Sequence, residues 1–183
     1  MPVTPFHMGP GLLAKALLGR HLSLMVFGFS QVAIDLEPLV HIVRGDAVLH
    51  GFAHTYVGAT LVASFSVVAG RPICQRLLAR WTPDPASPFL IWLRGPDRIA
   101  WPAAIVGAFV GTYSHVFLDS IMHADVQPIA PLSAGNALLG VVSLGSLHLL
   151  CVAGGVLGAL GIGLAFARRR APSPSDGPGG GVW

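Results

Sequence analysis

Charged residues are scarce in this chain of 183 residues: Asp, Glu, Lys and Arg together make up 10% of it, whereas 53% of its residues are hydrophobic. Soluble globular domains usually contain about 25% charged residues. The mean hydropathy of +0.69 agrees with this imbalance. The composition excludes an ordinary soluble enzyme and predicts an integral membrane protein of one domain.

Cysteine is equally rare, with Cys74 and Cys151 as the only two. We expect Cys74 in a basic loop and Cys151 in a membrane helix, which is poor geometry for a structural disulfide. A cleaved signal peptide is not expected either, because no basic segment precedes the first apolar stretch and the run from Leu22 carries Asp35 and Glu37. The N-terminal segment is therefore expected to stay in the mature protein.

Four apolar runs are long enough to cross a bilayer, which takes about 20 predominantly apolar residues per helix. They cover residues 22–43, 49–69, 100–122 and 137–166, the last with some tilt. The predicted fold class is therefore all-α: a polytopic membrane helical bundle with about four long spans, in a domain covering residues 1–170. The remaining segment, 171–183, is rich in Pro, Gly and Ser and is predicted to be a disordered tail.

Two further helices are predicted outside the spans. Thr4 and Pro5 are typical of a helix start, and a short N-terminal helix there would form an antiparallel hairpin with the first span. With a rise of about 1.5 Å per residue, this hairpin returns His7 to the level of Asp35. In the segment 71–98, apolar residues recur at i, i+3, i+4 and i+7, which predicts an amphipathic helix along the membrane interface.

The basic residues indicate how the chain is oriented. Ten of the eleven lie before the first span, between the second and third spans, or after the fourth, and Arg44 is the exception. Alternating spans place these segments on one side of the membrane, which the positive-inside rule identifies as the cytoplasm. We therefore expect a bacterial inner-membrane protein with a cytoplasmic C-terminus and with the loops near 41–50 and 123–136 on the extracytoplasmic side. The lipid bilayer, and not nucleic acid, is the expected partner; the oligomeric state stays open.

Two histidines, His50 and His54 in the segment LHGFAHT, stand four residues apart. At the predicted start of a helix this spacing puts both imidazoles on one face, which is a two-ligand metal geometry. The alternative is a chance pair of interfacial polar residues.

The third span repeats this spacing in YSHVFLDSIMHAD, where His115, Asp119 and His123 share one face and Asp125 follows. A charged group in the middle of a membrane helix costs about 2.5–3.5 kcal/mol, so such residues persist mainly where they bind a ligand or one another. Either a metal site or a buried His–Asp hydrogen bond that locks two helices together accounts for this face.

Topology brings these groups to one layer on the non-basic side of the membrane. The first long span is predicted to break near Pro38, with Asp35 and Glu37 around the break, and the hairpin adds His7. A mixed set of imidazoles and carboxylates suits a divalent metal, with zinc the first choice and manganese or iron next, as one or two ions. His148 is expected in the middle of the last span, well below this layer, as a packing residue.

Five segments resemble the predicted membrane-bound metal-dependent hydrolases called YdjM-like: MPVTPFHMGPG, AIDLEPL, HGFAHT, GTYSHVFLDSIMHAD and PIAPLS. The resemblance covers most of residues 1–150. It implies an active site made of His7, Asp35, Glu37, His50, His54, His115 and Asp119. Many family members carry an HRGxTHS-like segment, with shorter histidine spacing, where this chain reads LHGFAHT, and Asp is common at the position of Glu37. A weaker similarity, in ligand types and order, is to zinc-dependent phospholipases C.

The main hypothesis is hydrolysis of a phospholipid or lipid-linked ester at a metal centre on the membrane surface. The predicted metal ligands are His7, Asp35, His50, His54, His115 and Asp119; the predicted catalytic residues are Asp35 and Glu37, the latter as general base or bridging ligand; and His123 and Asp125 are expected beside the ligands or the substrate. A metal-ion or proton transporter or channel is the second hypothesis, and a noncatalytic membrane scaffold held by His–Asp pairs is the third.

Overall fold

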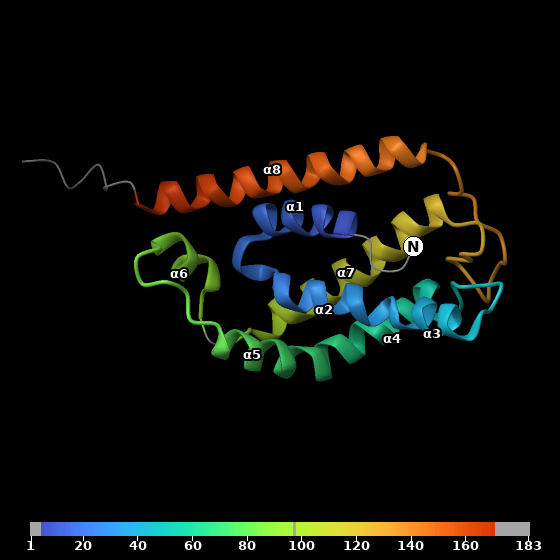
Figure 1. Ribbon diagram of the computed structural model, residues 1–183, viewed down its shortest axis with the longest axis horizontal. Coiled ribbons are helices and arrows are strands. Elements are labelled where there is room, and N and C mark those ends of the chain that lie inside the picture. Colours follow the sequence, from blue (N-terminus) through green and yellow to red (C-terminus); the bar gives the residue numbers. More distant parts are fainter. Residues whose placement is uncertain (1–4, 97, 171–183) are drawn as a thin grey trace, which may run out of the picture.

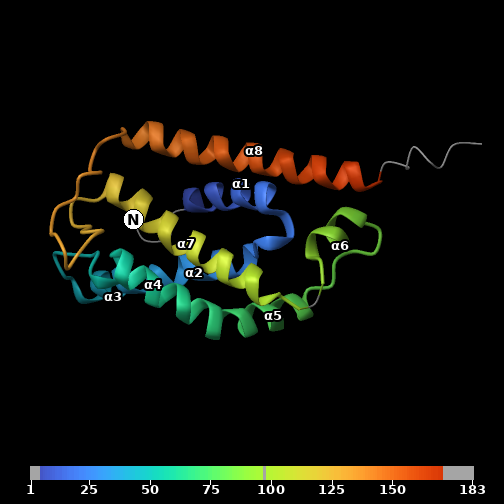
Figure 2. The same ribbon diagram turned by 180° about the vertical axis from the view of Figure 1, so that it is seen from behind.

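The computed structural model describes residues 5–96 and 98–170, and these residues form helices and no strand (Figure 1). Four helical stretches are long and apolar enough to cross a membrane: Leu24–Arg44, Tyr56–Arg80, Trp101–Met122 and Leu144–Arg169. All four run along the long axis of the molecule in both views (Figures 1 and 2). The prediction of an all-α bundle with four long spans is confirmed.

In chain order the elements are η1 (Pro5–His7), α1 (Met8–Leu18), η2 (Gly19–His21), α2 (Leu24–Ile34), α3 (Leu36–Arg44), η3 (Phe52–His54), α4 (Tyr56–Phe65), η4 (Ser66–Gly70), α5 (Arg71–Arg80), α6 (Pro88–Arg94), α7 (Trp101–Met122) and α8 (Leu144–Arg170). The elements η1, η2 and η3 are short 3-10 turns, and η4 is a π-helical turn between α4 and α5.

The N-terminal hairpin that the sequence predicts is formed by α1, η2 and α2. Lys15 closes its turn, because its Nζ donates to the carbonyl oxygens of Gly19 and Leu22 at 2.9 and 2.8 Å. Ser23 then caps α2 by accepting a hydrogen bond from the N–H of Val26. The hairpin returns the N-terminal end of α1 to the end of the molecule where α2 finishes (Figure 1).

Glycines allow α1 to lie directly against α8. A Cβ added to Gly9 would stand 2.0 Å from the carbonyl oxygen of Cys151, and one added to Gly158 would stand 2.4 Å from the carbonyl carbon of Leu12. No side chain fits at such distances, so the two backbones touch only because these positions are glycine. This contact fixes the position of His7, which immediately precedes α1.

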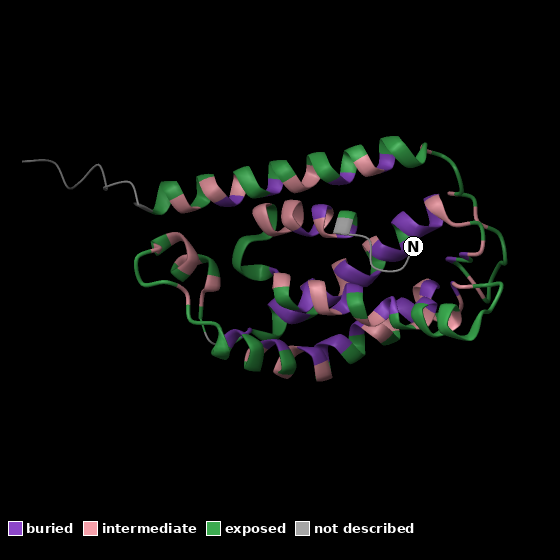
Figure 3. Ribbon diagram, viewed as in Figure 1, coloured by how far each residue is buried: buried purple, intermediate pink, exposed green. Residues whose placement is uncertain are grey.

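The central helix α7 is the most deeply buried of the long helices (Figure 3). A Cβ at Gly107 would stand 2.5 Å from the carbonyl oxygen of Ser23, and one at Gly111 would stand 2.1 Å from Oγ of Ser30. These contacts bring α2 and α7 together along their length. Ala59, on α4, packs with Ile34 and Val116 on another side of the same helix.

Two boundaries differ from the sequence-based prediction. The second span begins at Tyr56, not at residue 49, and it continues through η4 and α5 to Arg80. The amphipathic helix predicted in the segment 71–98 is therefore largely the end of this span, followed by the short helix α6. Cys74 explains the difference, because it is buried and its Sγ donates to the carbonyl oxygen of Met25 at 3.4 Å.

The other two differences concern the ends of helices. The first long span breaks at Asp35, between α2 and α3, so Pro38 lies inside the first turn of α3 and is not itself the break. Pro is tolerated there because the N–H groups of a first turn have no intrahelical partner. The last helix begins at Leu144, not at residue 137. Cys74 and Cys151 are both free thiols, and the predicted tail, 171–183, lies outside the described residues.

Most of the arginines lie at the opposite end of the molecule from the predicted site residues. The η2 turn, the end of α5, α6 and the end of α8, which carry most of the arginines, lie together at one end (Figure 1). The α2–α3 junction, η3, the end of α7 and the start of α8 lie at the other end. The segments predicted to carry the site are therefore gathered away from the basic end.

Candidate metal centre

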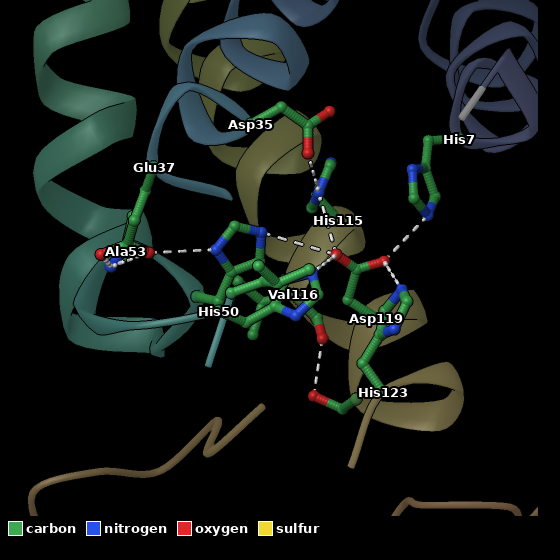
Figure 4. A network of polar contacts seen from close by, with 12 residues as sticks. His7, Asp35, Glu37, His50, Ala53, His115, Val116, Asp119 and His123 are labelled. Carbon is green, nitrogen blue, oxygen red and sulfur yellow. Dashed lines mark hydrogen bonds and ion pairs between the residues drawn. The ribbon is translucent and has the colours of Figure 1, made fainter. Parts of the chain in front are cut away.

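Asp119, near the end of α7, lies at the centre of a cluster of imidazoles (Figure 4). Its Oδ1 is 3.3 Å from Nε2 of His7 and 4.0 Å from Nε2 of His123. Its Oδ2 is 3.2, 3.5 and 3.8 Å from the Nε2 atoms of His115, His54 and His50, respectively. Five imidazoles therefore direct the same ring nitrogen at one carboxylate, and all of them except His123 are buried.

Asp35 joins this cluster from the junction of α2 and α3. The residue itself forms the break, with φ −72° and ψ −9°, and its carboxylate lies beside α7. Its Oδ1 is 3.3 Å from Nε2 of His115. The break thus turns an acidic side chain of the first span toward the central helix.

Hydrogen bonding does not account for this arrangement. Among the buried side-chain atoms of residues 5–96 and 98–170, those with no hydrogen-bond partner are Nε2 of His7, His54 and His115, Oδ1 of Asp119, and Nδ1 of His7. The first four face one another. Leaving one buried polar atom unpaired costs about 1–3 kcal/mol. Four such atoms directed at one another indicate a site built for a shared cation.

The tautomer of His115 follows from its neighbours. Gln31 donates from Nε2 to the carbonyl oxygen of Gly111 at 3.1 Å, which leaves its Oε1 facing Nδ1 of His115 at 2.5 Å. An amide oxygen can only accept, so Nδ1 of His115 carries the hydrogen. In the neutral ring Nε2 then has a lone pair, and this lone pair faces the oxygens of Asp35 and Asp119.

His54 is held in the same way by Glu37. The Glu37 carboxylate accepts hydrogen bonds from the backbone N–H groups of Gly51 and Ala53 and lies 3.3 Å from Nδ1 of His54. Nδ1 of His54 is therefore the donor, and Nε2 is left with a lone pair directed at Asp119. The backbone of the η3 turn and its histidine are thus positioned by one carboxylate.

Asp125 holds His50. One oxygen accepts from Nδ1 of His50 at 2.9 Å, and the other accepts from the backbone N–H groups of Leu49 and His50 at 2.9 and 3.0 Å. Burial alone would raise the pKa of Asp125, but these hydrogen bonds, first that from the His50 backbone, lower its pKa to about 2. The carboxylate is ionised at neutral pH and accepts the His50 hydrogen.

Neutral imidazoles are the form that binds a metal. Burial lowers the pKa of both His54 and His123 below the ordinary value, and it outweighs the opposing effect of nearby carboxylates. His54 and His123 are therefore unprotonated at neutral pH, and in this form their nitrogens can act as metal ligands.

The distances also fit a metal. Ligand atoms that lie about 2.0–2.1 Å from a tetrahedral zinc ion are separated from one another by about 3.3 Å. The separations of Asp119 from His7 and from His115 are 3.3 and 3.2 Å, and that of His115 from Asp35 is 3.3 Å. Metal-binding histidines characteristically donate their other N–H to a carboxylate or carbonyl oxygen, as His50, His54 and His115 do here. The cluster could hold a metal ion, and its donor set suits one.

The described residues contain four overlapping ligand groups, which are His7–His115–Asp119, Asp35–His54–His115, His50–His54–Asp119 and His50–His123–Asp125. Within each group the candidate ligand atoms lie no more than 4.8 Å apart. Asp119 belongs to two of the groups, and its two oxygens face different histidines.

Comparison with protein-family models, with curated proteins and with solved structures finds no match to this chain. The similarity to YdjM-like hydrolases thus stays a resemblance of motifs.

All six residues predicted as metal ligands contribute to these groups: His7, Asp35, His50, His54, His115 and Asp119. His123 and Asp125 form the fourth group with His50. Glu37 lies behind His54 and not among the groups, so its predicted role as general base stays a prediction.

The predicted local structure of the histidine pair is wrong. His50 lies in a loop and His54 ends the η3 turn, so the two residues do not share a helical face. Their rings nevertheless meet, with centroids 4.7 Å apart. The loop brings the two imidazoles together in place of the predicted helix, because its backbone is hydrogen-bonded to Asp125 and to Glu37.

Two other residues were misjudged from the sequence. His148 is near the start of α8, not in the middle of the span, and its ring stacks on Phe6 with centroids 4.4 Å apart. It therefore packs beside His7, at the level of the cluster. Gln31 was missed as a site residue because an amide in an apolar run gives no spacing signal, although a buried amide in a membrane helix is itself unusual.

Proposed function

We propose that this protein is an integral, metal-dependent hydrolase of the bacterial inner membrane, with its site on the extracytoplasmic face. The observation that carries the proposal concerns His50, His54 and His115. In each ring Nδ1 is already hydrogen-bonded, and Nε2 is directed at Asp119. The positive-inside rule supports the orientation, because the arginines cluster at the opposite end of the bundle.

We propose two divalent ions, with zinc the first choice and manganese or iron next. Asp119 would help to hold both, since His7 and His123 face its Oδ1, while His54 and His115 face its Oδ2. Asp35 adds a second carboxylate on the His115 side and His50 a further imidazole on Oδ2. When bound, such ions polarise the scissile group and activate water for attack.

Other residues of the protein fix the orientation of the metal ligands. Glu37, Asp125 and Gln31 fix the tautomers of the three histidines to which they are bonded. Burial keeps the imidazoles of His54 and His123 neutral. Asp35, whose Oδ1 faces Nε2 of His115, is the carboxylate that we assign to the reacting side.

The position of the cluster suggests the substrate. The ligands lie nearer one end of the bundle than the other: His54 just precedes the span Tyr56–Arg80, His115 and Asp119 lie in the last two turns of α7, and Asp35 lies at the α2–α3 break. At that depth the ester and phosphate groups of lipids meet water. A phospholipid or a lipid-linked ester is therefore the substrate that we propose.

A transporter is the weaker alternative. A transport path needs polar groups through the full depth of the membrane. Below the cluster, the hydroxyls of Ser30 and Thr112 donate to carbonyl oxygens of their own helices, from Phe27 and Ala108, and do not extend the cluster. This arrangement favours a site at one end over a path.

The test is a hydrolysis assay on purified, metal-loaded protein with phosphate diesters, carboxylic esters and phospholipids in nanodiscs. His115→Ala removes a ligand and is expected to lower turnover at least about a hundredfold. His41→Ala is the matched control, because that half-buried histidine pairs with Asp46 away from the cluster and should leave turnover unchanged. Failure of the loaded wild type to hydrolyse any of these esters, together with metal flux in proteoliposomes that His115→Ala abolishes, would replace hydrolysis by transport.

A further inference from the structure

An open pocket of about 400 Å³ adjoins the candidate metal centre. It is lined by Val48, His50, Gly51, Phe52, Thr55, Asp125, Gln127, Ala130 and Pro131. His50 belongs to both, because it is among the residues that line the pocket and its Nε2 faces Asp119. The pocket therefore leads to the cluster from outside.

The two walls of this pocket are held together by hydrogen bonds. Asp125, in the wall that follows α7, accepts from the backbone N–H groups of Leu49 and His50 in the opposite wall. At the other end, the N–H of Tyr56 donates to the carbonyl oxygen of Pro128 at 2.8 Å. The pocket is thus preformed by the fold and does not depend on a ligand to bring its walls together.

The lining combines apolar surface with few charges. Val48 and Phe52 are 57% and 55% exposed and contribute apolar surface to the lining. Among the described residues that line the pocket there is no lysine or arginine, and Gln127 offers an uncharged amide. The carboxylate of Asp125 is fully engaged with the opposite wall.

The pocket lies where lipid head groups are found. Its two walls, 48–55 and 125–131, directly precede or follow the ends of the helices α4 and α7, which are long enough to span. Ile129 and Leu132, beside the second wall, are 49% and 92% exposed. Apolar side chains at this level insert into the boundary between head groups and acyl chains.

Charge balance limits what the pocket can bind. The carboxylates of Asp35, Glu37, Asp119 and Asp125 would be neutralised by two divalent ions. A ligand without net charge keeps this balance, whereas a diphosphate or nucleotide would bring several negative charges that no cation of the pocket wall compensates.

We propose that this pocket binds the head of a phospholipid from the adjacent leaflet, with a zwitterionic head group and a single phosphate. The phosphate would lie next to His50, the polar head against Gln127, and the acyl chains along Phe52 and the exposed apolar residues of the second wall. This assignment rests on the proposed function for its chemistry, but binding can be tested without turnover.

The test measures protection of a cysteine in the pocket of the full-length protein. Gln127→Cys is labelled with a charged, water-soluble maleimide in detergent; the native Cys74 and Cys151 are buried. A short-chain phosphatidylethanolamine at ten times its Kd should slow labelling about tenfold, and farnesyl diphosphate at the same concentration should not. Ala134→Cys, on the same loop but outside the pocket, should be labelled at one rate throughout.

Equal labelling of Gln127→Cys with and without phospholipid, or stronger protection by the diphosphate, would overturn the assignment. The outcome is separate from that of the hydrolysis assay. Protection without hydrolysis would retain the pocket and reject the enzyme, whereas hydrolysis of soluble esters without protection would retain the enzyme and reject the pocket.

Discussion

The histidine tautomers distinguish a metal site from a set of structural His–Asp pairs. In a structural pair, a neutral histidine donates its hydrogen to the carboxylate that it contacts. At His115, however, the hydrogen lies on Nδ1, because Gln31 is itself fixed by Gly111. In the neutral ring, the nitrogen that faces Asp119 has no hydrogen to give, and a cation between the two removes the conflict.

Gln31 therefore acts on the site through His115, whose Nδ1 hydrogen it accepts. Gln31→Leu removes the acceptor for Nδ1 and is expected to lower metal affinity about 10–100-fold, the usual cost of losing such a partner. The measurement is a metal titration with a chromophoric chelator as competitor. Gln75→Leu is the control, because this glutamine accepts only from the N–H of Ile99 at the opposite end of the bundle. Equal affinity in both variants would remove Gln31 from the site.

Asp125 provides a prediction on pH. Its pKa of about 2 in the folded protein is below the ordinary value, so the ionised form is favoured by folding. Its stabilising effect should be complete above the unfolded pKa of about 4 and should be lost as the pH falls toward 2. We expect metal-free Asp125→Asn to be less stable than wild type at pH 6, with the difference vanishing by about pH 2, as measured by thermal unfolding in detergent. A difference that is constant with pH would show that the charge is not involved.

At the scale of helices, the contact of α1 with α8 decides where His7 lies. Gly9→Ala would place a methyl group 2.0 Å from the carbonyl oxygen of Cys151, so α1 must move away from α8. Because His7 is two residues earlier, we expect this variant to bind one ion less tightly, by at least about tenfold, while the ion on the His54 side is retained. Two-step metal titration measures both affinities.

Gly163→Ala is the matched control for that experiment. A Cβ at this position of α8 meets nothing within 4 Å. The substitution should leave both metal affinities unchanged and raise helix stability slightly, by up to about 1 kcal/mol. Loss of the same ion in both variants would contradict the role assigned to the contact of α1 with α8.

Much of this helical framework could be predicted from composition and spacing. The four spans, the N-terminal hairpin and the level of His7 follow from apolar run lengths and the rise of a helix. The end of the second span could not be predicted from the sequence. Arginines along α5 are compatible both with an amphipathic helix on the membrane surface and with the end of a membrane-spanning helix. Arg71 is satisfied by tertiary contacts, with Nε on the carbonyl oxygen of Ile99 and its guanidinium 4.1 Å from the ring of Trp101.

The site was predictable in its residues but not in its geometry. Spacing pointed to His50 and His54, yet they are brought together by a loop that Glu37 and Asp125 hold from distant positions in the chain. Such contacts leave no periodic signal. The position of Asp119, between two sets of histidines, likewise depends on how helices pack and not on any one of them.

For the whole molecule, the separation of charge is the governing feature. Arginines gather at one end of an apolar bundle, and the described histidines and carboxylates of the cluster gather at the other (Figure 1). Under the positive-inside rule, we expect a bundle with this distribution to insert in one orientation. The cluster lies at a single end of the bundle, beside the pocket between residues 48–55 and 125–131.

The measurement that tests the account most directly is the metal content of the purified wild-type protein, determined by mass spectrometry after expression with added zinc, manganese and iron. We predict about two transition-metal ions per chain, and fewer in Asp119→Asn, because the carboxylate that helps to hold both ions is changed. The exposed Asp46→Asn should retain the wild-type content. Wild-type protein that carries no stoichiometric transition metal under these conditions would contradict the account.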